Sequence, residues 1–378
     1  MLTLGIQWIF DKHVLGIMDR SLVITEIKKM WKEVFHDTDK YIDLFFSSYV
    51  NKSFLIFATH DTNIVASLMS VPYTAICNID GSNQCSRCAL YLCGLMTDPL
   101  FRSKGIMSRL LNMSGVLSEK ISADFEFLIP SDNRNRDYYQ CRGFVNSFDY
   151  DEVKLYRDMF ADIDNNVSDI QYIRTENDRK IFDSVCDLFV SYECGLQGFL
   201  ISHSHYDYSI ICKDCVGDGG VVVSCVVDDI VKGAAIVSIA EGKVLVKYLA
   251  AYSDMIAMRL IRDIFNSFGT DIVILRVFPG QYFLFLDTII RNYPETKVTV
   301  KYGMSRCLRN HENLKFTDNS SSSFKFSILA PSMDTSVLCS DFFHFNRYSC
   351  FKNLWRVPGG GGYCGTENIK SSLFLMLD

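Results

Sequence analysis

The chain has 378 residues, of which 48% are hydrophobic and 22% are charged, and its formal net charge is -6. A chain of this length can bury more than one hydrophobic core, which predicts two or three domains. The acidic balance argues against a general nucleic-acid-binding protein and is compatible with a cationic substrate. Its 14 cysteines follow no even spacing, which indicates a reducing compartment rather than a disulfide scaffold, so we expect a cytoplasmic protein.

The first 18 residues, "MLTLGIQWIFDKHVLGIM", are apolar but interrupted by Asp11, Lys12 and His13. They lack the basic start and the small-residue cleavage site of a signal peptide. No run in the chain approaches the roughly 20 apolar residues of a membrane-spanning helix. We therefore treat residues 1–18 as an N-terminal extension and expect no membrane partner.

The first half of the chain alternates helical and strand patterns. Helices are expected first, and a hairpin with its turn at residues 61–63 follows them. A further strand, helix, strand, helix and strand come next. In chain order these elements are expected at residues 24–35, 37–50, 53–77, 88–98, 104–119, 124–130, 134–142 and 143–148. A hairpin ahead of strand–helix–strand units predicts an α/β fold with a mixed sheet.

The second half repeats this order some 150 residues later, which predicts a structural duplication. A strand, two helices, three strands, a helix and a strand are expected at 168–173, 179–192, 197–213, 219–253, 254–268 and 271–278. We place the two domains at residues 19–155 and 165–305. Residues 306–378 contain a serine-rich stretch and a glycine run, and they end in the apolar "LFLMLD". They are expected to form a small C-terminal extension that ends in a buried strand.

One short stretch, "DPLFRSKGIMSRLL" at residues 98–111, places two basic residues and a glycine ahead of a helical pattern. A helix N-terminus offers N–H groups without partners and a dipole that favours negative charge. The stretch therefore predicts an anion-binding site. Asp98 is expected to act as a turn or capping residue.

The stretch and the downstream "FLIPSDNRNRDYYQCRGF" together resemble the GCN5-related N-acetyltransferases over roughly residues 20–150. The family's signature (Q/R)-x-x-G-x-(G/A) is matched from Arg102, with Met107 in place of the final small residue. The resemblance implies acetyl-CoA as co-substrate, with its pantetheine beside Leu95, Met96 and Thr97. It also implies that backbone amides of one loop bind the pyrophosphate, and this loop consists of Arg102, Ser103, Lys104, Gly105, Ile106 and Met107.

The second motif, "YYQCRGF", places Tyr139 four residues before Gly143. The resemblance implies that this tyrosine protonates the departing CoA thiolate. Tyr138 is its neighbour, but adjacent helical residues point about 100° apart, so only one of them can face the cofactor. The alternative is that Tyr139 only packs against the sheet.

The wider pattern resembles the tandem-domain, enhanced-intracellular-survival (Eis-like) branch of that family. The corresponding stretch of the second half, "AAYSDMIAMRLIRD", has no glycine, so that copy is not expected to hold CoA. In this branch the terminal carboxylate acts as general base, which the resemblance assigns here to Asp378. A buried carboxylate has a raised pKa and is a better base near neutrality. The alternative is a terminal strand whose last residue emerges into water.

These observations predict an acetyl-CoA-dependent N-acetyltransferase that acts by direct attack in a ternary complex. The acceptor is expected to be a primary amine on a small molecule or peptide, of cationic character. No metal and no nucleic acid are expected, and a homo-oligomer is compatible with the sequence. A non-catalytic acyl-CoA-binding sensor or scaffold is the alternative, and an acyltransferase with another donor is a third hypothesis.

Two C-x-x-C pairs, Cys85/Cys88 and Cys212/Cys215, raise the question of zinc. They fall in different predicted domains more than a hundred residues apart, so a shared site is not favoured. His203 and His205 near the second pair add little. The glycine run at 359–362 lacks the lysine and hydroxyl residue of a phosphate loop.

Overall fold

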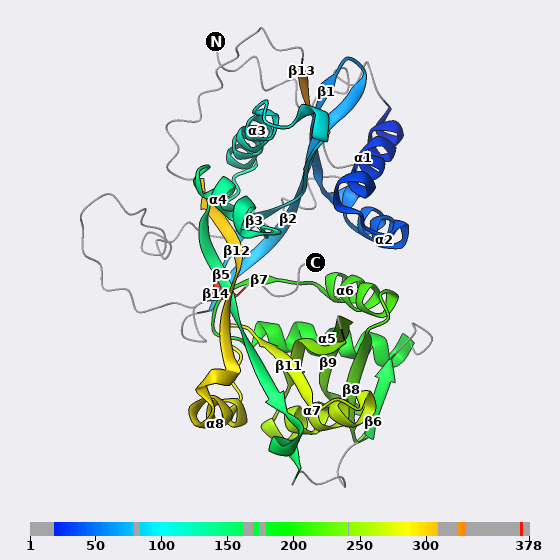
Figure 1. Ribbon diagram of the computed structural model, residues 1–378, viewed down its shortest axis with the longest axis vertical. Helices are drawn as coiled ribbons and strands as arrows, with labels where there is room; N and C mark the ends of the chain where they lie inside the picture. Colours follow the sequence, from blue (N-terminus) through cyan, green and yellow to red (C-terminus); the bar gives the residue numbers. More distant parts are fainter. Residues whose placement is uncertain are drawn as a thin grey trace, which may run out of the picture. The chain divides into compact units, whose positions relative to one another are not determined.

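The computed structural model describes residues 19–78, 84–161, 169–173, 179–240, 242–308, 324–329 and 371–372. The chain divides into two compact units (Figure 1). The first unit is Met1–Thr74, Ser86–Val145 and Met304–Cys364. The second unit is Ala75–Cys85, Asn146–Gly303 and Gly365–Asp378.

The first unit is a mixed sheet with helices on both faces. Its strands follow the order β13-β1-β2-β3-β4-β12. Strands β3 and β4 are parallel, whereas β1 pairs antiparallel with β2 and with β13, and β4 pairs antiparallel with β12. The elements are α1 (Arg20–Phe35), α2 (Asp39–Tyr49), β1 (Phe54–His60), β2 (Asn63–Asn78), β3 (Gln84–Thr97), α3 (Ile106–Lys120), β4 (Phe125–Leu128), α4 (Asn133–Gln140), β12 (Lys297–Cys307) and β13 (Phe324–Leu329). The predicted α/β class, mixed sheet and hairpin are confirmed.

The second unit repeats this architecture. Its strands follow the order β12-β5-β11-β10-β9-β8-β6, with β14 (Ser371–Ser372) paired to β7. Its elements are β5 (Val145–Tyr156), β6 (Asp169–Ile173), α5 (Arg179–Cys194), β7 (Gly198–Ser202), α6 (His205–Gly217), β8 (Val221–Val227), β9 (Ile230–Ala240), β10 (Lys243–Ala251), α7 (Asp254–Phe268), β11 (Ile272–Val277) and α8 (Leu284–Asn292).

One predicted helix, at residues 197–213, is wrong in its first half. Residues Gly198–Ser202 form strand β7, whose central residues are buried. The helix begins only after Ser204, which forms a capping box with Asp207. A short apolar run cannot be assigned to strand or helix by periodicity alone, and the cap sets the boundary here.

The duplication is visible in the element order. In each copy two helices precede three antiparallel strands, and a helix then connects the third strand to a parallel fourth strand: β3–α3–β4 in one copy and β10–α7–β11 in the other. The last strands are exchanged, because β5 pairs with β11 and β12 pairs with β4. The domain limits 19–155 and 165–305 stay a prediction.

Both faces of the first sheet are buried. Helices α1 and α2 lie on one side of β1–β3, and α3 and α4 lie on the other (Figure 1). On the α1 side the Trp31 ring contacts Phe45 and Phe46 with centroids 5.1 and 5.5 Å apart. On the α3 side Ile56 of β1 is buried in one cluster with Leu110 of α3. This double coverage explains why β1 reads as a continuous apolar run.

A buried ion pair joins three elements of the first unit. Glu126 of β4 is fully buried, and Arg306 of β12 is 4% exposed. Nε of Arg306 donates to the carboxylate at 3.0 Å, and Nη2 donates to the carbonyl of Leu111 in α3 at 2.9 Å. The hydroxyls of Ser114 and Ser118 donate to the other carboxylate oxygen at 2.5 and 2.7 Å. The carboxylate therefore accepts from a guanidinium and from two hydroxyls, which is the compensation that a buried charge requires.

Replacing Arg306 by methionine should lower the free energy of unfolding by about 3–5 kcal/mol, because Glu126 then stays buried without its counter-charge. Urea denaturation followed by circular dichroism measures the change.

The matched control is Lys32→Met, which removes a surface pair of Lys32 with Asp39 at 2.7 Å. Both side chains are more than half exposed, so this loss should stay below about 1 kcal/mol. Equal losses in the two variants would contradict a structural role for the buried pair.

Candidate functional site

The predicted loop lies between β3 and α3. After Thr97 the chain forms a short 3-10 turn, Pro99–Phe101, and α3 begins at Ile106. The Asp98 side chain accepts a hydrogen bond from the backbone N–H of Leu100 at 2.8 Å. Asp98 is therefore a capping residue, as predicted.

The N-terminus of α3 is open. Gly105 is its N-cap at φ +73°, and Ser103 also has a left-handed backbone at φ +63°. No side chain caps the helix, and its first turn contains no acidic residue. Residues 102–105 are exposed. Backbone N–H groups of the first turn are thus left for an anion, with the helix dipole behind them.

Basic side chains surround this opening. Nε of Arg102 donates to the carbonyl of Thr97 at 3.1 Å, which fixes the guanidinium beside the end of β3. Nζ of Lys104 lies 4.7 Å from the centroid of the Phe101 ring. The loop therefore holds two basic side chains next to N–H groups that no side chain caps, a combination suited to a phosphate.

A third cation, Arg142, is one that the sequence did not reveal as a site residue. Its Nη2 donates to Oγ of Ser108 in the first turn of α3 at 2.7 Å, and its guanidinium lies 3.4 Å from the Tyr138 ring centroid. Ser108 and Arg142 are 34 residues apart, so only the fold brings them together. The sequence feature that could have pointed to Arg142 was its position beside Gly143 in the second motif.

Strands β3 and β4 pair over only part of their length. The register joins Ala89–Tyr91 to Phe125–Phe127, and β3 then continues to Thr97. Gly94 interrupts this continuation with φ +57°, where a Cβ atom would lie 2.4 Å from the Trp31 ring. Leu95, Met96 and Thr97 thus lie beyond the last residue of β3 that pairs with β4. Backbone groups at such a divergence can pair with an extended ligand.

Tyr139 on α4 belongs to the same hydrophobic cluster as Leu95 and Leu128, at the ends of the two diverging strands. It is 9% exposed, and burial, with smaller contributions from Tyr138 and Asp132, raises its pKa well above the usual value. The hydroxyl is therefore protonated at neutral pH and can donate. No residue in the described part of the chain hydrogen-bonds to it.

Tyr138 points elsewhere. Its hydroxyl lies 3.3 Å from Oγ of Ser108, at the start of α3. The two adjacent tyrosines thus face different parts of the site, as their spacing on a helix predicts. Tyr139 lies among the ends of β3 and β4, and Tyr138 lies beside the anion opening.

The second copy lacks the corresponding opening. Ser253 caps α7 by accepting from the N–H of Ile256 at 3.3 Å, and Asp254 occupies the first turn. The β10–β11 pairing ends at Val246, and the Gln281 amide donates beyond it to the Leu249 carbonyl at 2.8 Å. The start of α7 is therefore capped by a hydroxyl with an acidic residue beside it, and a side-chain amide bonds to β10 beyond its parallel pairing. These contacts support the prediction that this copy does not hold CoA.

The other predicted residues are only partly tested. Asp378 and residues 359–362 lie outside the described residues, as does the Cys85 side chain. Cys215 donates its thiol to the carbonyl of Val237 at 3.3 Å, and burial raises its pKa to about 11. In the ranges that the structure describes, no three His, Cys, Asp or Glu side chains gather as they would around a metal ion.

Comparisons with known proteins relate part of the first copy to one family. Residues 22–145 match the model of the acetyltransferase (GNAT) domain. No protein with curated annotation matches the chain in sequence. No helix in the described ranges is both long and apolar enough to span a bilayer.

Solved structures extend the likeness to the second copy. A conserved protein of Enterococcus faecalis V583, described as a probable N-acyltransferase, is 13% identical with a TM-score of 0.62 over 77% of this chain and 71% of that chain. A GCN5-related N-acetyltransferase from Anabaena variabilis ATCC 29413 is 11% identical, with a TM-score of 0.57 over 77% and 72%. Eis1 from Mycobacterium abscessus is 12% identical, with a TM-score of 0.55 over 78% and 73%. At these identities the likeness shows the fold alone, and it extends over about three quarters of this chain, beyond the residues that the family model matches.

Two glycines of the site give a matched stability experiment. Gly94→Ala should cost about 2–5 kcal/mol, because it adds overlap with Trp31 to the strain of a positive φ. Gly105→Ala meets nothing within 4 Å and should cost only about 1–2 kcal/mol from the backbone. Urea denaturation of both variants decides the point, and a larger loss for Gly105→Ala would contradict the assigned packing.

Proposed function

We propose that this protein is an acetyl-CoA-dependent N-acetyltransferase with its active site in the first unit, where residues 22–145 match the model of the acetyltransferase (GNAT) domain. The observation that carries the proposal is the open N-terminus of α3, whose left-handed Ser103 and Gly105 lie ahead of uncapped N–H groups. A diphosphate requires convergent N–H donors and nearby cations, and this loop supplies both.

The end of strand β3 provides the remaining contacts to acetyl-CoA, the acetyl donor. Leu95, Met96 and Thr97 offer backbone groups to the pantetheine arm beyond the paired part of β3. Met107 differs from the family signature, but its side chain packs against the hydrophobic cluster of α3. Because the loop binds through its backbone, a side chain directed into the core leaves the N–H of residue 107 available. The departure from the signature is therefore compatible with acetyl-CoA binding.

The chemistry is direct transfer between two bound substrates. The terminal Asp378 takes a proton from the acceptor ammonium, and the free amine attacks the thioester carbon. A backbone N–H among residues 95–97 stabilises the oxyanion, and the C–S bond then breaks. Tyr139 donates its proton to the leaving thiolate, and the second proton of the attacking nitrogen then restores Tyr139 and leaves a neutral amide. No covalent enzyme intermediate is needed.

The acceptor is proposed as a primary amine with net positive charge, in keeping with the chain's net charge of -6. A polyamine, an aminoglycoside and a lysine side chain all have this chemistry. Mass spectrometry of acetyl transfer across a panel of these amines tests the proposal. Acetyl-CoA binding without transfer to any amine would favour the sensor alternative, and transfer only from another acyl-CoA would favour a different donor.

Acetyl-CoA binding tests the loop before activity is measured. Arg142→Gln should weaken binding about tenfold in calorimetry, because it removes the cation that is hydrogen-bonded to the first turn of α3. Arg134→Gln is the matched control, since it removes an exposed arginine of the neighbouring helix α4 and should change the affinity less than twofold. Equal effects, or no binding by the unmodified protein, would contradict the assigned site.

Tyr139→Phe should lower kcat by about 10²–10⁴ while the dissociation constant of acetyl-CoA stays within about twofold. Tyr138→Phe is the control and should retain most of kcat. Because burial raises the pKa of Tyr139, its hydroxyl stays protonated on the alkaline side, so kcat should not fall between pH 8 and about 10 through this group.

Deletion of Asp378 is the companion experiment for the base. It should lower kcat and shift the acid side of the pH profile without loss of acetyl-CoA binding. If both Tyr139→Phe and the deletion leave turnover unchanged, the proposed acid and base are wrong.

A further inference from the structure

A bulge divides strand β3 into two halves. Leu92 and Leu95 are three residues apart, yet both pack in the hydrophobic cluster that contains Leu110 of α3. Residues three apart in a regular strand lie on opposite faces of the sheet, so one extra residue is inserted between these two leucines. Gly94 is that residue, because its backbone is left-handed at φ +57°. Bulges with a left-handed glycine bend a strand and leave a residue outside the hydrogen-bond ladder.

The bulge decides where the second half of β3 points. Tyr91 is the last residue of β3 that pairs with β4, and beyond the bulge the strand stays attached to β2, since the N–H of Asp98 donates to the Val65 carbonyl at 2.9 Å. The N–H groups of residues 95–97 stabilise an oxyanion only if they are aimed at it before its charge develops. Glycine has the widest backbone freedom of all residues, so Gly94 needs a neighbour that holds its conformation.

The ring of Trp31 in α1 is that neighbour. A Cβ atom on Gly94 would lie 2.4 Å from Cζ3 of the ring and 3.0 Å from Cε3, so the ring packs directly on the backbone of the bulge. Trp31 is 5% exposed. The rings of Phe35, Phe45 and Phe46 surround it, with centroids at 5.2, 5.1 and 5.5 Å. Aromatic contacts therefore keep the indole pressed against Gly94.

One hydrogen bond fixes the rotation of the indole. Its Nε1 donates to Oδ2 of Asp37 at 2.6 Å. Asp37 lies in the turn between α1 and α2, after His36, whose left-handed backbone donates to the Lys32 carbonyl at 3.0 Å, and before Thr38, which caps α2. Because the turn is fixed on both sides, the carboxylate holds the indole N–H in one direction.

We propose that Trp31, oriented by Asp37, is a positioning residue for acyl transfer. Its ring keeps Gly94 in the left-handed conformation and thereby aims the N–H groups of residues 95–97 at the thioester oxygen. This inference rests on the proposed function. Trp31 acts through the backbone and is not a catalytic residue, because α1 lies on the opposite face of the sheet from α3 and α4, which carries Tyr139 (Figure 1).

The first test compares Trp31→Leu with Tyr49→Leu. Tyr49 is the matched control because it is also a buried ring of the α1–α2 layer, 3% exposed, and it contacts Phe45 with centroids 5.1 Å apart. Trp31→Leu should lower kcat about tenfold or more, while the dissociation constant of acetyl-CoA, which depends mainly on the loop at residues 102–107, changes less than about threefold. Tyr49→Leu should retain most of kcat, so lost packing alone cannot explain a difference.

Hydrogen exchange measured by mass spectrometry gives a second readout that needs no activity. Trp31→Leu should raise the exchange rate of the amides in residues 89–97 about threefold or more, because the strand loses the ring that holds its bulge. Tyr49→Leu should leave this segment unchanged.

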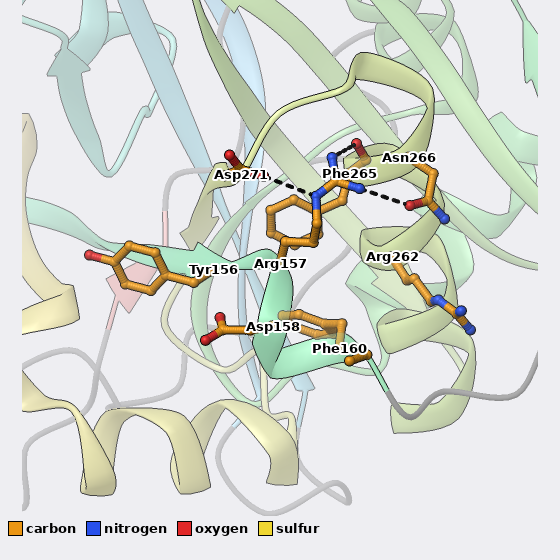
Figure 2. Close-up of a pocket in the computed structure, with 9 residues that line it drawn as sticks. Tyr156, Arg157, Asp158, Phe160, Arg262, Phe265, Asn266 and Asp271 are labelled. Atoms are coloured by element: carbon orange, nitrogen blue, oxygen red, sulfur yellow. Dashed lines mark hydrogen bonds and ion pairs between the residues drawn. The ribbon is translucent and has the colours of Figure 1, made fainter.

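The end of α7 in the second unit serves as the reference segment for exchange. Arg157 holds it by donating to the Phe265 carbonyl at 2.8 Å, to Oδ1 of Asn266 at 3.0 Å and to Oδ1 of Asp271 at 3.2 Å (Figure 2). These bonds involve no group of the first unit, so exchange in residues 262–271 should be the same in all variants.

Asp37 provides a pair of variants that keep the indole ring. Asp37→Ala removes the acceptor of the indole N–H, so it should change kcat and the exchange of residues 89–97 in the same direction as Trp31→Leu, by about twofold or more. Asp37→Asn keeps an acceptor oxygen and should restore both values.

The inference is overturned if Trp31→Leu and Tyr49→Leu have equal effects on kcat and on exchange in residues 89–97, or if Asp37→Asn behaves like Asp37→Ala. If the unmodified protein transfers no acetyl group, the proposed function fails. Exchange in residues 89–97 then still decides whether Trp31 holds the bulge.

Discussion

The buried pair of Glu126 and Arg306 is the constraint on which the first unit depends. Its carboxylate accepts hydrogen bonds from α3 and β12. The Glu126 carboxylate therefore joins α3 and β12 to its own strand, β4. Arg306 Nη1 also donates to the carbonyl of Arg142 at 3.3 Å. The Arg142 side chain in turn bonds to Ser108 at the start of α3. A continuous set of hydrogen bonds thus runs from the core to the first turn of α3.

This set of bonds explains why the last strands are exchanged between the two copies. Glu126 is fully buried, and its counter-charge comes from residue 306, after the whole second copy. A fragment that ended at residue 155 would leave that carboxylate in the core without an arginine. An uncompensated buried charge costs several kcal/mol, which is a large share of a domain's stability. The stability of the first copy therefore depends on strand β12, although this strand follows the second copy in the sequence.

Local sequence patterns predicted the elements whose formation depends on neighbouring residues. The helices and the β1–β2 hairpin follow from periodicity and turn residues, and an anion site ahead of α3 follows from two basic residues and a glycine before a helix. The limits of the loop, residues 102–107, came from the resemblance to the family signature. Arg142 and Arg306 were not predicted as site or core partners, because neither has a local signature and each meets its partner only in the folded chain. Strand β7 was misassigned because its burial, rather than its composition, selects the extended form.

The two copies share one architecture but differ at the N-terminus of the helix that connects their parallel strands. Both have a helix between parallel strands, but α3 begins at a left-handed glycine without a cap, whereas α7 begins at a serine cap followed by an aspartate. An anion is therefore favoured at the first helix and opposed at the second.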